Sequence, residues 1–195
     1  MSTMSSRIAV LVPCFNEEVA IKKVVEDFKK YLPKAKIYVY DNNSTDATST
    51  IAKNSGAIVK VETLQGKGYV VRRMFADIDA DIYVLVDGDD TYDASVASAL
   101  IHELQENQLD MVNAARVSSS KESYRSGHRF GNWLLTSMVS WIFGQRFTDM
   151  LSGYRVFSRR YVKSFPAEAR GFEIETELTV HALQLNLPVS EMYQI

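Results

Sequence analysis

The chain has 195 residues and a formal net charge of −2, a length typical of one folded domain and a charge that excludes a general nucleic-acid-binding protein. With 46% hydrophobic and 24% charged residues, the composition excludes a disordered chain, a collagen and a coiled coil. The one cysteine, Cys14, excludes an internal disulfide and a cysteine-based zinc site, and indicates a reducing, cytoplasmic compartment.

The first half of the sequence alternates between short apolar runs and longer segments with helical periodicity. The apolar runs predict strands at residues 8–12, 36–40, 57–61, 82–86 and 110–115. The segments between them predict helices at residues 17–32, 44–54, 67–78 and 94–107. This alternation predicts an α/β fold: one Rossmann-like domain whose mostly parallel, twisted central sheet carries helices on both faces.

The second half begins with a basic segment and continues with the apolar segment 130–144. That segment is too short and too polar to cross a bilayer, and two interpretations remain open for it. It is a core helix, or it is a helix at a lipid interface that allows peripheral contact with a membrane. A helix near residues 173–186 and a final strand from residue 187 are predicted after it.

Polar clusters follow several of the predicted strands. They are "PCFNEE" (13–18), "DNNSTD" (41–46) and "DGDD" (87–90). Ligands of parallel α/β sheets bind beyond the carboxyl ends of the strands, so these clusters predict a shared site. Helix caps and turns are the alternative explanation, equally good for "DNNSTD" taken alone.

The "DGDD" cluster carries the most specific chemistry. Asp87 and Asp89 are two residues apart, so in extended backbone they project to the same side. Like charges so close destabilise each other unless a cation relieves them, and Gly88 lets another group approach the backbone. We expect Mg²⁺ or Mn²⁺, held here and bridging to phosphates. An Asp-Gly turn that caps the next helix is the alternative.

Several familiar nucleotide and hydrolase sites are excluded by missing motifs. The sequence contains no GxGxxG fingerprint, no GxxxxGK[ST] loop and no GxSxG elbow. A sugar-1-phosphate nucleotidyltransferase would need a glycine-rich basic loop after the first strand, where "PCFNEE" stands instead.

Six motifs in register carry a resemblance to a known family. They are "VPCFNEE", "YDNNSTDAT", "GKGYVVRRM", "VLVDGDDTYD", "DMLSGYRVFSRR" and "GFEIETEL". In this order and at these intervals the chain, from about residue 7 onwards, resembles the family 2 glycosyltransferases of GT-A fold. Its nearest branch resembles dolichyl-phosphate mannose synthases and polyprenyl-phosphate glucosyltransferases.

The resemblance implies a site for a nucleotide diphosphate sugar, UDP- or GDP-linked. Pro13, Phe15 and Glu17 match the family's loop around base and ribose, and Asp41 matches its base-contacting aspartate. Two interpretations remain open for Lys67: its side chain contacts the donor, or it is solvated.

The same resemblance assigns Asp87, Gly88 and Asp89 to the DxD motif. Asp87 and the Gly88 backbone would touch the nucleotide, and Asp89, assisted by Asp87, would hold the metal on the diphosphate. Thr91 stands where the family often has Asp, Gln or His, so no further metal ligand is expected there.

The acceptor side is indicated by charge. The fixed charges between residues 116 and 129 are Arg116, Lys121, Glu122, Arg125 and Arg129, a net charge of +3. The planar guanidinium of arginine can donate two hydrogen bonds to phosphate oxygens. In the synthases that this chain resembles, the corresponding region binds a lipid phosphate. We therefore expect Arg116, Arg125 and Arg129 to bind the phosphate of a polyprenyl or dolichyl acceptor, with a solvated basic face as the alternative.

The expected reaction is a metal-dependent, inverting hexose transfer. A lipid phosphate is already ionised near neutral pH and needs no base, whereas a sugar hydroxyl of a glycan acceptor does. Asp149 is the first candidate for that base and Glu175 the second, each with an ordinary turn or helix-face role as alternative. A soluble enzyme of polysaccharide synthesis and a non-catalytic nucleotide-sugar-binding module are the competing functions.

The resemblance also predicts the domain organisation. Residues 7–115 form the nucleotide-sugar half and residues 116–195 the acceptor half of one catalytic domain. The chain stops at "SEMYQI", where the lipid-phosphate branch continues into a basic segment over the donor phosphates, so a C-terminally truncated core is expected. Its location is expected to be cytoplasmic, extending to the inner face of a membrane.

Overall fold

The computed structural model describes residues 6–115 and 148–193, and the strands in these ranges form one seven-stranded sheet in the order β3-β2-β1-β4-β6-β5-β7. The strand bounds are β1 Ile8–Cys14, β2 Lys36–Asp41, β3 Ile58–Val61, β4 Ile82–Leu85, β5 Met111–Ala115, β6 Arg155–Ser158 and β7 Val189–Tyr193. The predicted strands are all present, with ends shifted by one or two residues, and the final strand begins at Val189 rather than at the predicted residue 187.

Most strand pairs are parallel. β1 pairs in parallel with β2 and β4, β2 with β3, and β5 with β7. β6 runs antiparallel to both of its neighbours, β4 and β5. The prediction of a mostly parallel sheet is therefore confirmed, and the reversed strand β6 is a feature that the alternating pattern did not predict.

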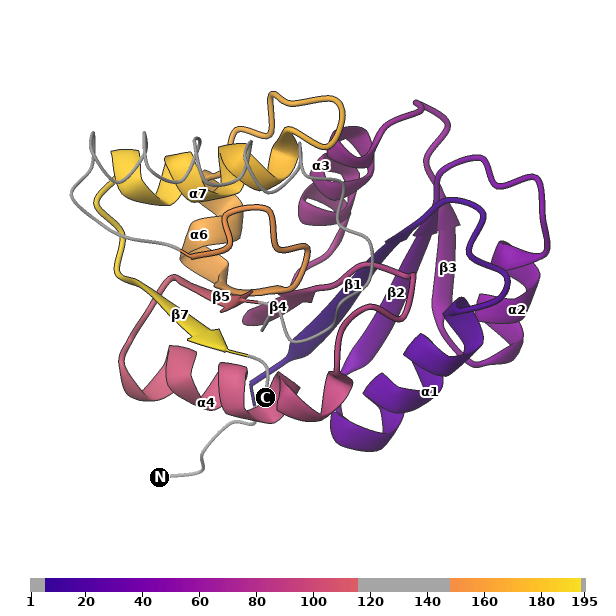
Figure 1. The fold of residues 1–195 in the computed structure, drawn as a ribbon, viewed down its shortest axis with the longest axis horizontal. Coiled ribbons are helices and arrows are strands. Elements are labelled where there is room, and N and C mark those ends of the chain that lie inside the picture. The colour runs from indigo at the N-terminus through magenta and orange to yellow at the C-terminus, as the bar shows by residue number, and fades with distance from the viewer. Residues whose placement is uncertain (1–5, 116–147, 194–195) are drawn as a thin grey trace.

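Helices cover both faces of the sheet (Figure 1). The helix bounds are α1 Ile21–Tyr31, α2 Thr48–Asn54, α3 Lys67–Asp77, α4 Ala97–Glu106, α6 Arg159–Ser164 and α7 Ile174–Gln184, with a short 3₁₀ turn η1 at Ala94–Val96. α1, α2 and α4 lie against one face, and α3, α6 and α7 lie against the other. The predicted helix at 130–144 lies outside the described residues.

The alternation of side chains along each strand creates two cores. On β1, Val10 and Val12 face the core with α1, α2 and α4, whereas Ala9 and Leu11 face the core with α3, α6 and α7. Strands buried on both faces need apolar residues at consecutive positions, which explains the continuous run "IAVLV". No helix in the described ranges is long and apolar enough to cross a membrane.

Candidate active site

The carboxyl ends of β1 and β2 each lead into a polar loop, and the two loops interlock. The Asn16 amide donates to Ser44 Oγ over 2.8 Å, and the Glu17 amide donates to Thr48 Oγ1 over 2.8 Å. In the other direction, the Thr45 amide donates to Asn16 Oδ1 over 2.8 Å. Ser44 and Thr45 are used in this way, and α2 begins at Thr48 rather than at the predicted residue 44.

Asp41 lies at the end of β2 and is almost fully buried. Its Oδ1 accepts from the Ser44 amide over 3.0 Å, and its Oδ2 accepts from Ser49 Oγ over 2.6 Å. The carboxylate therefore supports the turn before α2, as the alternative explanation for this cluster predicted. A contact between Asp41 and a nucleotide base stays a prediction.

Asn42 has a positioning role that the sequence did not reveal. Its buried amide nitrogen donates to the carbonyls of Glu62 and Leu64 over 2.9 and 2.7 Å, and its Oδ1 accepts from the Gly66 amide over 2.7 Å. These bonds tie the end of β2 to the loop that opens α3. The only signal in the sequence was an Asn in a polar turn, which does not distinguish it from its neighbour Asn43.

Lys67, the first residue of α3, lies between two carboxylates. Its Nζ is 2.6 Å from Asp87 Oδ1, after β4, and 2.6 Å from Glu175 Oε1, in the first turn of α7. Burial lowers the pKa of Lys67, but Asp87 and Glu175 outweigh it, so the pKa is raised and the ammonium persists. The Lys67 side chain is only 9% exposed, so the solvated alternative is wrong.

The other carboxylates of the "DGDD" region have different surroundings. Asp89 is exposed, and its Oδ1 accepts from the Thr91 amide over 3.0 Å. Asp90 forms a surface ion pair with Lys23 at 2.7 Å. Asp93 Oδ1 accepts from the Ser95 amide over 2.8 Å and caps η1, the helical turn that follows this region.

The acids at this edge of the sheet influence one another. Burial raises the pKa of Glu17, and Asp89 and Asp87 raise it further. Burial also raises the pKa of the Cys14 thiol, with Glu17 and Asp41 adding to the effect. The pairing of Cys14 with Asp41 and of Leu11 with Leu85 brings these carboxylates to the same edge of the sheet, where they create a negative potential.

The donor atoms here fit a hard divalent cation. The described residues contain no group of three or more His, Cys, Asp and Glu side chains that could hold a metal alone. A cation bound by one or two carboxylates and by phosphate oxygens of a ligand does not need such a group. Asp89 has an exposed carboxylate suited to this role, whereas burial raises the pKa of Asp87, which is already paired with Lys67.

Glycines allow close contacts around Asp87. A Cβ on Gly153 would lie 2.1 Å from Asp87 Oδ2, and a Cβ on Gly88 would lie 2.6 Å from Cys14 Sγ. Either side chain would force a shift, because real Cβ atoms do not approach other atoms so closely. Gly153 therefore lets the segment before β6 pack directly on the carboxylate of Asp87.

Asp149, the candidate base, lies in that same segment and is buried. Its backbone is held by side chains from two neighbouring strands. The Asp149 amide donates to Glu191 Oε1 on β7 over 3.2 Å, and its carbonyl accepts from Asn113 Nδ2 on β5 over 2.8 Å. Glu191 Oε2 also accepts from the Thr148 amide and Oγ1 over 2.7 and 2.6 Å. Asn113 and Glu191 were not predicted, because their partners are distant in the sequence.

A buried arginine supports the next residues of the segment. Arg155, the first residue of β6, is 0% exposed. Its guanidinium donates to the Met150 carbonyl over 2.5 Å, to the Ser152 carbonyl over 3.0 Å and to Thr179 Oγ1 on α7 over 2.8 Å. Arg155 therefore joins the segment before β6 to α7.

Of the remaining predicted site residues, two lie within the described part of the chain and three lie outside it. Pro13 is buried within β1, and Phe15 is 49% exposed just after it. The three predicted phosphate-binding arginines, Arg116, Arg125 and Arg129, lie outside the described residues. The structure thus brings together Glu17, Asp41, Lys67, Gly88 and the DxD carboxylates.

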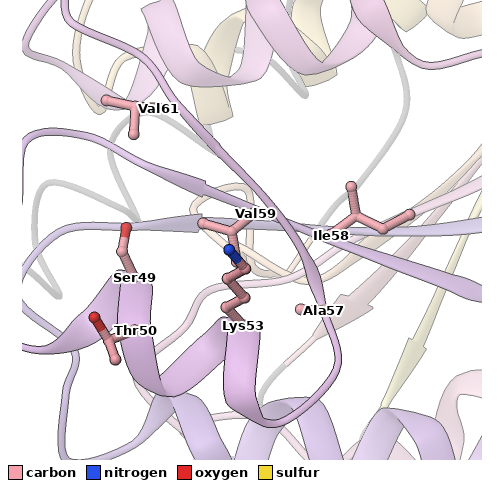
Figure 2. Close-up of a pocket in the computed structure, with 7 residues that line it drawn as sticks. All are labelled: Ser49, Thr50, Lys53, Ala57, Ile58, Val59 and Val61. Atoms are coloured by element: carbon pink, nitrogen blue, oxygen red, sulfur yellow. The ribbon is translucent and has the colours of Figure 1, made fainter.

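A hollow of about 470 Å³ lies elsewhere, at the sheet edge formed by β3 (Figure 2). It is lined by Ser49, Thr50 and Lys53 of α2 and by Ala57, Ile58, Val59 and Val61 of β3 and the residue before it. None of these lining residues is acidic, and none belongs to the strand-end cluster, so this hollow does not share the chemistry of the predicted site.

Three relatives are informative. Protein RfbJ from Shigella flexneri is 57% identical over 126 residues, 64% of this chain and 98% of that protein. Glycosyltransferase AglJ from Haloferax volcanii is 33% identical over 89% of this chain, which spans 57% of that protein. Dolichyl-phosphate hexose transferase, also from Haloferax volcanii, is 28% identical over 78% of this chain and 66% of that protein.

Solved structures support the fold. A crystal structure of glucosyl-3-phosphoglycerate synthase from Mycobacterium tuberculosis in complex with Mn²⁺, UDP and phosphoglyceric acid matches with a TM-score of 0.81 at 23% identity. The match covers 97% of this chain and 69% of that one.

The family model described as glycosyl transferase family 2 matches residues 9–165. The resemblance seen in the motifs is therefore confirmed, and the chain belongs to glycosyl transferase family 2.

Proposed function

We propose that this chain is the catalytic core of a hexosyltransferase that moves a hexose from a nucleotide diphosphate sugar to a polyprenyl or dolichyl phosphate. The observation that carries the donor half of this proposal is the meeting of Asp87, Asp89 and Glu17 at the strand ends, next to the buried ammonium of Lys67. Residues 7–115 form the nucleotide-sugar half and residues 116–195 the acceptor half.

On the donor side, Pro13, Phe15, Glu17 and Asp41 shape the loops that receive the nucleotide. The interlocked loops after β1 and β2 fix this surface before the ligand arrives, which lowers the entropy cost of binding. The missing side chain of Gly88 makes room for Cys14 Sγ, and a contact of the Gly88 backbone with the nucleotide stays a prediction. Asp87, held by Lys67, is assigned a contact with the nucleotide.

Asp89, with Asp87 beside it, would hold Mg²⁺ or Mn²⁺. When bound, the cation supplies a positive charge that neutralises the charge developing on the leaving diphosphate. The exposed Asp89 carboxylate and the negative potential around it support this assignment. The similarity in fold to a synthase crystallised with Mn²⁺ and UDP is consistent with it.

On the acceptor side, we assign the lipid phosphate to Arg116, Arg125 and Arg129. The support is the net charge of +3 in residues 116–129 and the name of the dolichyl-phosphate hexose transferase among the relatives. A phosphate monoester has a second pKa of about 6, so the acceptor is nucleophilic without a protein base. A cytoplasmic site at the inner face of a membrane would suit such an acceptor and stays a prediction.

The first test is thermal unfolding with UDP- and GDP-sugars, with and without Mn²⁺. We expect one nucleotide family to raise the unfolding temperature, and only when Mn²⁺ is present, because the cation joins the diphosphate to Asp89. Equal shifts with and without the metal, or no shift with any sugar nucleotide, would contradict the proposed donor site.

A second candidate function is transfer to a sugar hydroxyl, which needs a base. It is favoured by the fixed backbone of Asp149, whose amide and carbonyl are both held by side chains. Replacing Asp149 with Asn separates the two functions. For a lipid-phosphate acceptor we expect near-wild-type transfer, measured with radiolabelled donor. A folded Asp149→Asn protein that has lost at least about 100-fold in rate would instead indicate a base.

A further inference from the structure

The ion chain Asp87–Lys67–Glu175 contains one cation between two carboxylates and is largely buried. The side chains of Lys67, Glu175 and Asp87 are 9%, 13% and 25% exposed, and both Lys67 contacts measure 2.6 Å. Ion pairs so shielded from water interact far more strongly than surface pairs. The ammonium therefore neutralises much of the charge of Asp87 before any ligand binds.

The position of Lys67 is fixed by the backbone on which it stands. Gly66 and Gly68 flank it, and a Cβ on either would lie 2.2 Å from a backbone carbonyl oxygen of Arg170 or Ala169. The Gly68 amide also donates to the Arg170 carbonyl over 3.1 Å. The start of α3 thus packs on the segment that leads into α7, and the two helices lie on the same face of the sheet (Figure 1).

Glu175 reaches Lys67 from the first turn of α7, 108 residues away in the sequence. On the other side of Asp87, Gly153 packs against Oδ2 of the carboxylate. Asp87 is therefore held between Lys67 and the segment before β6, whereas its partner Asp89 is exposed. The charge of Asp87 is thus compensated by a buried ammonium, whereas Asp89, two residues later, faces solvent.

We propose that Lys67 and Glu175 are positioning residues that set the affinity of the Asp87–Asp89 pair for a divalent cation. Lys67 lowers the affinity by neutralising Asp87, and Glu175 restores part of it by drawing the same ammonium away from Asp87. This inference rests on the proposed metal-dependent function and deepens it. It assigns Glu175 a role through Lys67 rather than as a base.

The test measures the binding of Mn²⁺ alone by electron paramagnetic resonance at constant pH and ionic strength. Lys67→Gln keeps a polar side chain but removes the positive charge, so we expect Mn²⁺ to bind about tenfold more tightly than in the wild type. Glu175→Gln leaves the ammonium to Asp87 alone, so we expect Mn²⁺ to bind several-fold more weakly.

Lys60→Met is the matched control. Lys60 pairs with Asp77 at 3.0 Å on the surface, so its loss changes the net charge equally at a position away from the DxD motif. We expect unchanged Mn²⁺ binding. Thermal unfolding of each variant confirms that it is folded before the titration.

The opposite signs of the two effects distinguish this role from a structural one. Damage to the fold would weaken Mn²⁺ binding in both variants, and that result would overturn the inference. If Lys67→Gln does not fold, Glu175→Gln decides the case, since unchanged or tighter binding there would also overturn it. Failure of the wild type to show any Mn²⁺-dependent stabilisation by sugar nucleotides would be a failure of the proposed function instead.

Discussion

Replacing Asp89 with Ala is expected to reduce hexose transfer by about 100- to 1000-fold and to abolish the Mn²⁺-dependent rise in unfolding temperature with sugar nucleotide. The size follows from the loss of one group that stabilises charge developing in the transition state. Asp89 is exposed and makes one bond to the Thr91 amide, so we expect the fold to persist. Radiolabelled transfer and thermal unfolding are the measurements.

Asp90→Asn is the matched control for this prediction. Asp90 is the next residue and carries the same charge, but it pairs with Lys23 on the surface. Its φ of 61° lies in the left-handed region, which Asn tolerates better than Ala. We expect its transfer rate and its response to Mn²⁺ to match those of the wild type. Equal losses in both variants would mean that the site depends on net charge and not on a cation at Asp89.

Replacing Arg155 with Met is expected to lower the free energy of unfolding by about 3–5 kcal/mol, because removal of a fully buried polar group leaves its partners unpaired. The side chain of Met fills much of the same space but cannot donate to the carbonyls of Met150 and Ser152 or to Thr179. Urea unfolding followed by circular dichroism gives the free energy.

The control for Arg155 is Arg73→Met. Arg73 lies on the exposed face of α3, where it pairs with Asp77 four residues later, and its side chain is 55% exposed. Surface pairs of this kind contribute little to stability, so we expect an unchanged urea midpoint. A loss for Arg155→Met no larger than that for Arg73→Met would contradict the view that Arg155 supports the segment before β6.

The periodicity of hydrophobic residues predicted most strands and helices of this fold well. β1 and β4 lie inside the sheet and are buried on both faces, so their sequences are continuously apolar and their positions were clear. The strand β6 was missed because "RVFS" is short and opens on an arginine, whose guanidinium is buried by bonds to the carbonyls of Met150 and Ser152 and to Thr179 on α7. Hydrophobic pattern carries no information about such partners.

The candidate site was predicted in part, for a similar physical reason. The carboxylates that follow β4 are visible in the sequence because four acids so close together need an explanation. The burial of Lys67 between Asp87 and Glu175 was not visible, since its partners lie on two other elements. The positions of Asn42, Asn113 and Glu191 were hidden in the same way, because each acts on backbone distant in the sequence.

The antiparallel direction of β6 decides where the segment before it lies. The loops that follow parallel strands lie at one edge of the sheet, and the loop that precedes an antiparallel strand lies at that same edge. Arg155, the first residue of β6, accordingly pairs with Leu85, two residues before Asp87. The stretch carrying Asp149 and Gly153 thus reaches Asp87 in the proposed donor site while being anchored on β5, β6 and β7. Under the proposed function, substitutions in that stretch change which acceptor is bound and leave the strands below the proposed nucleotide site unchanged.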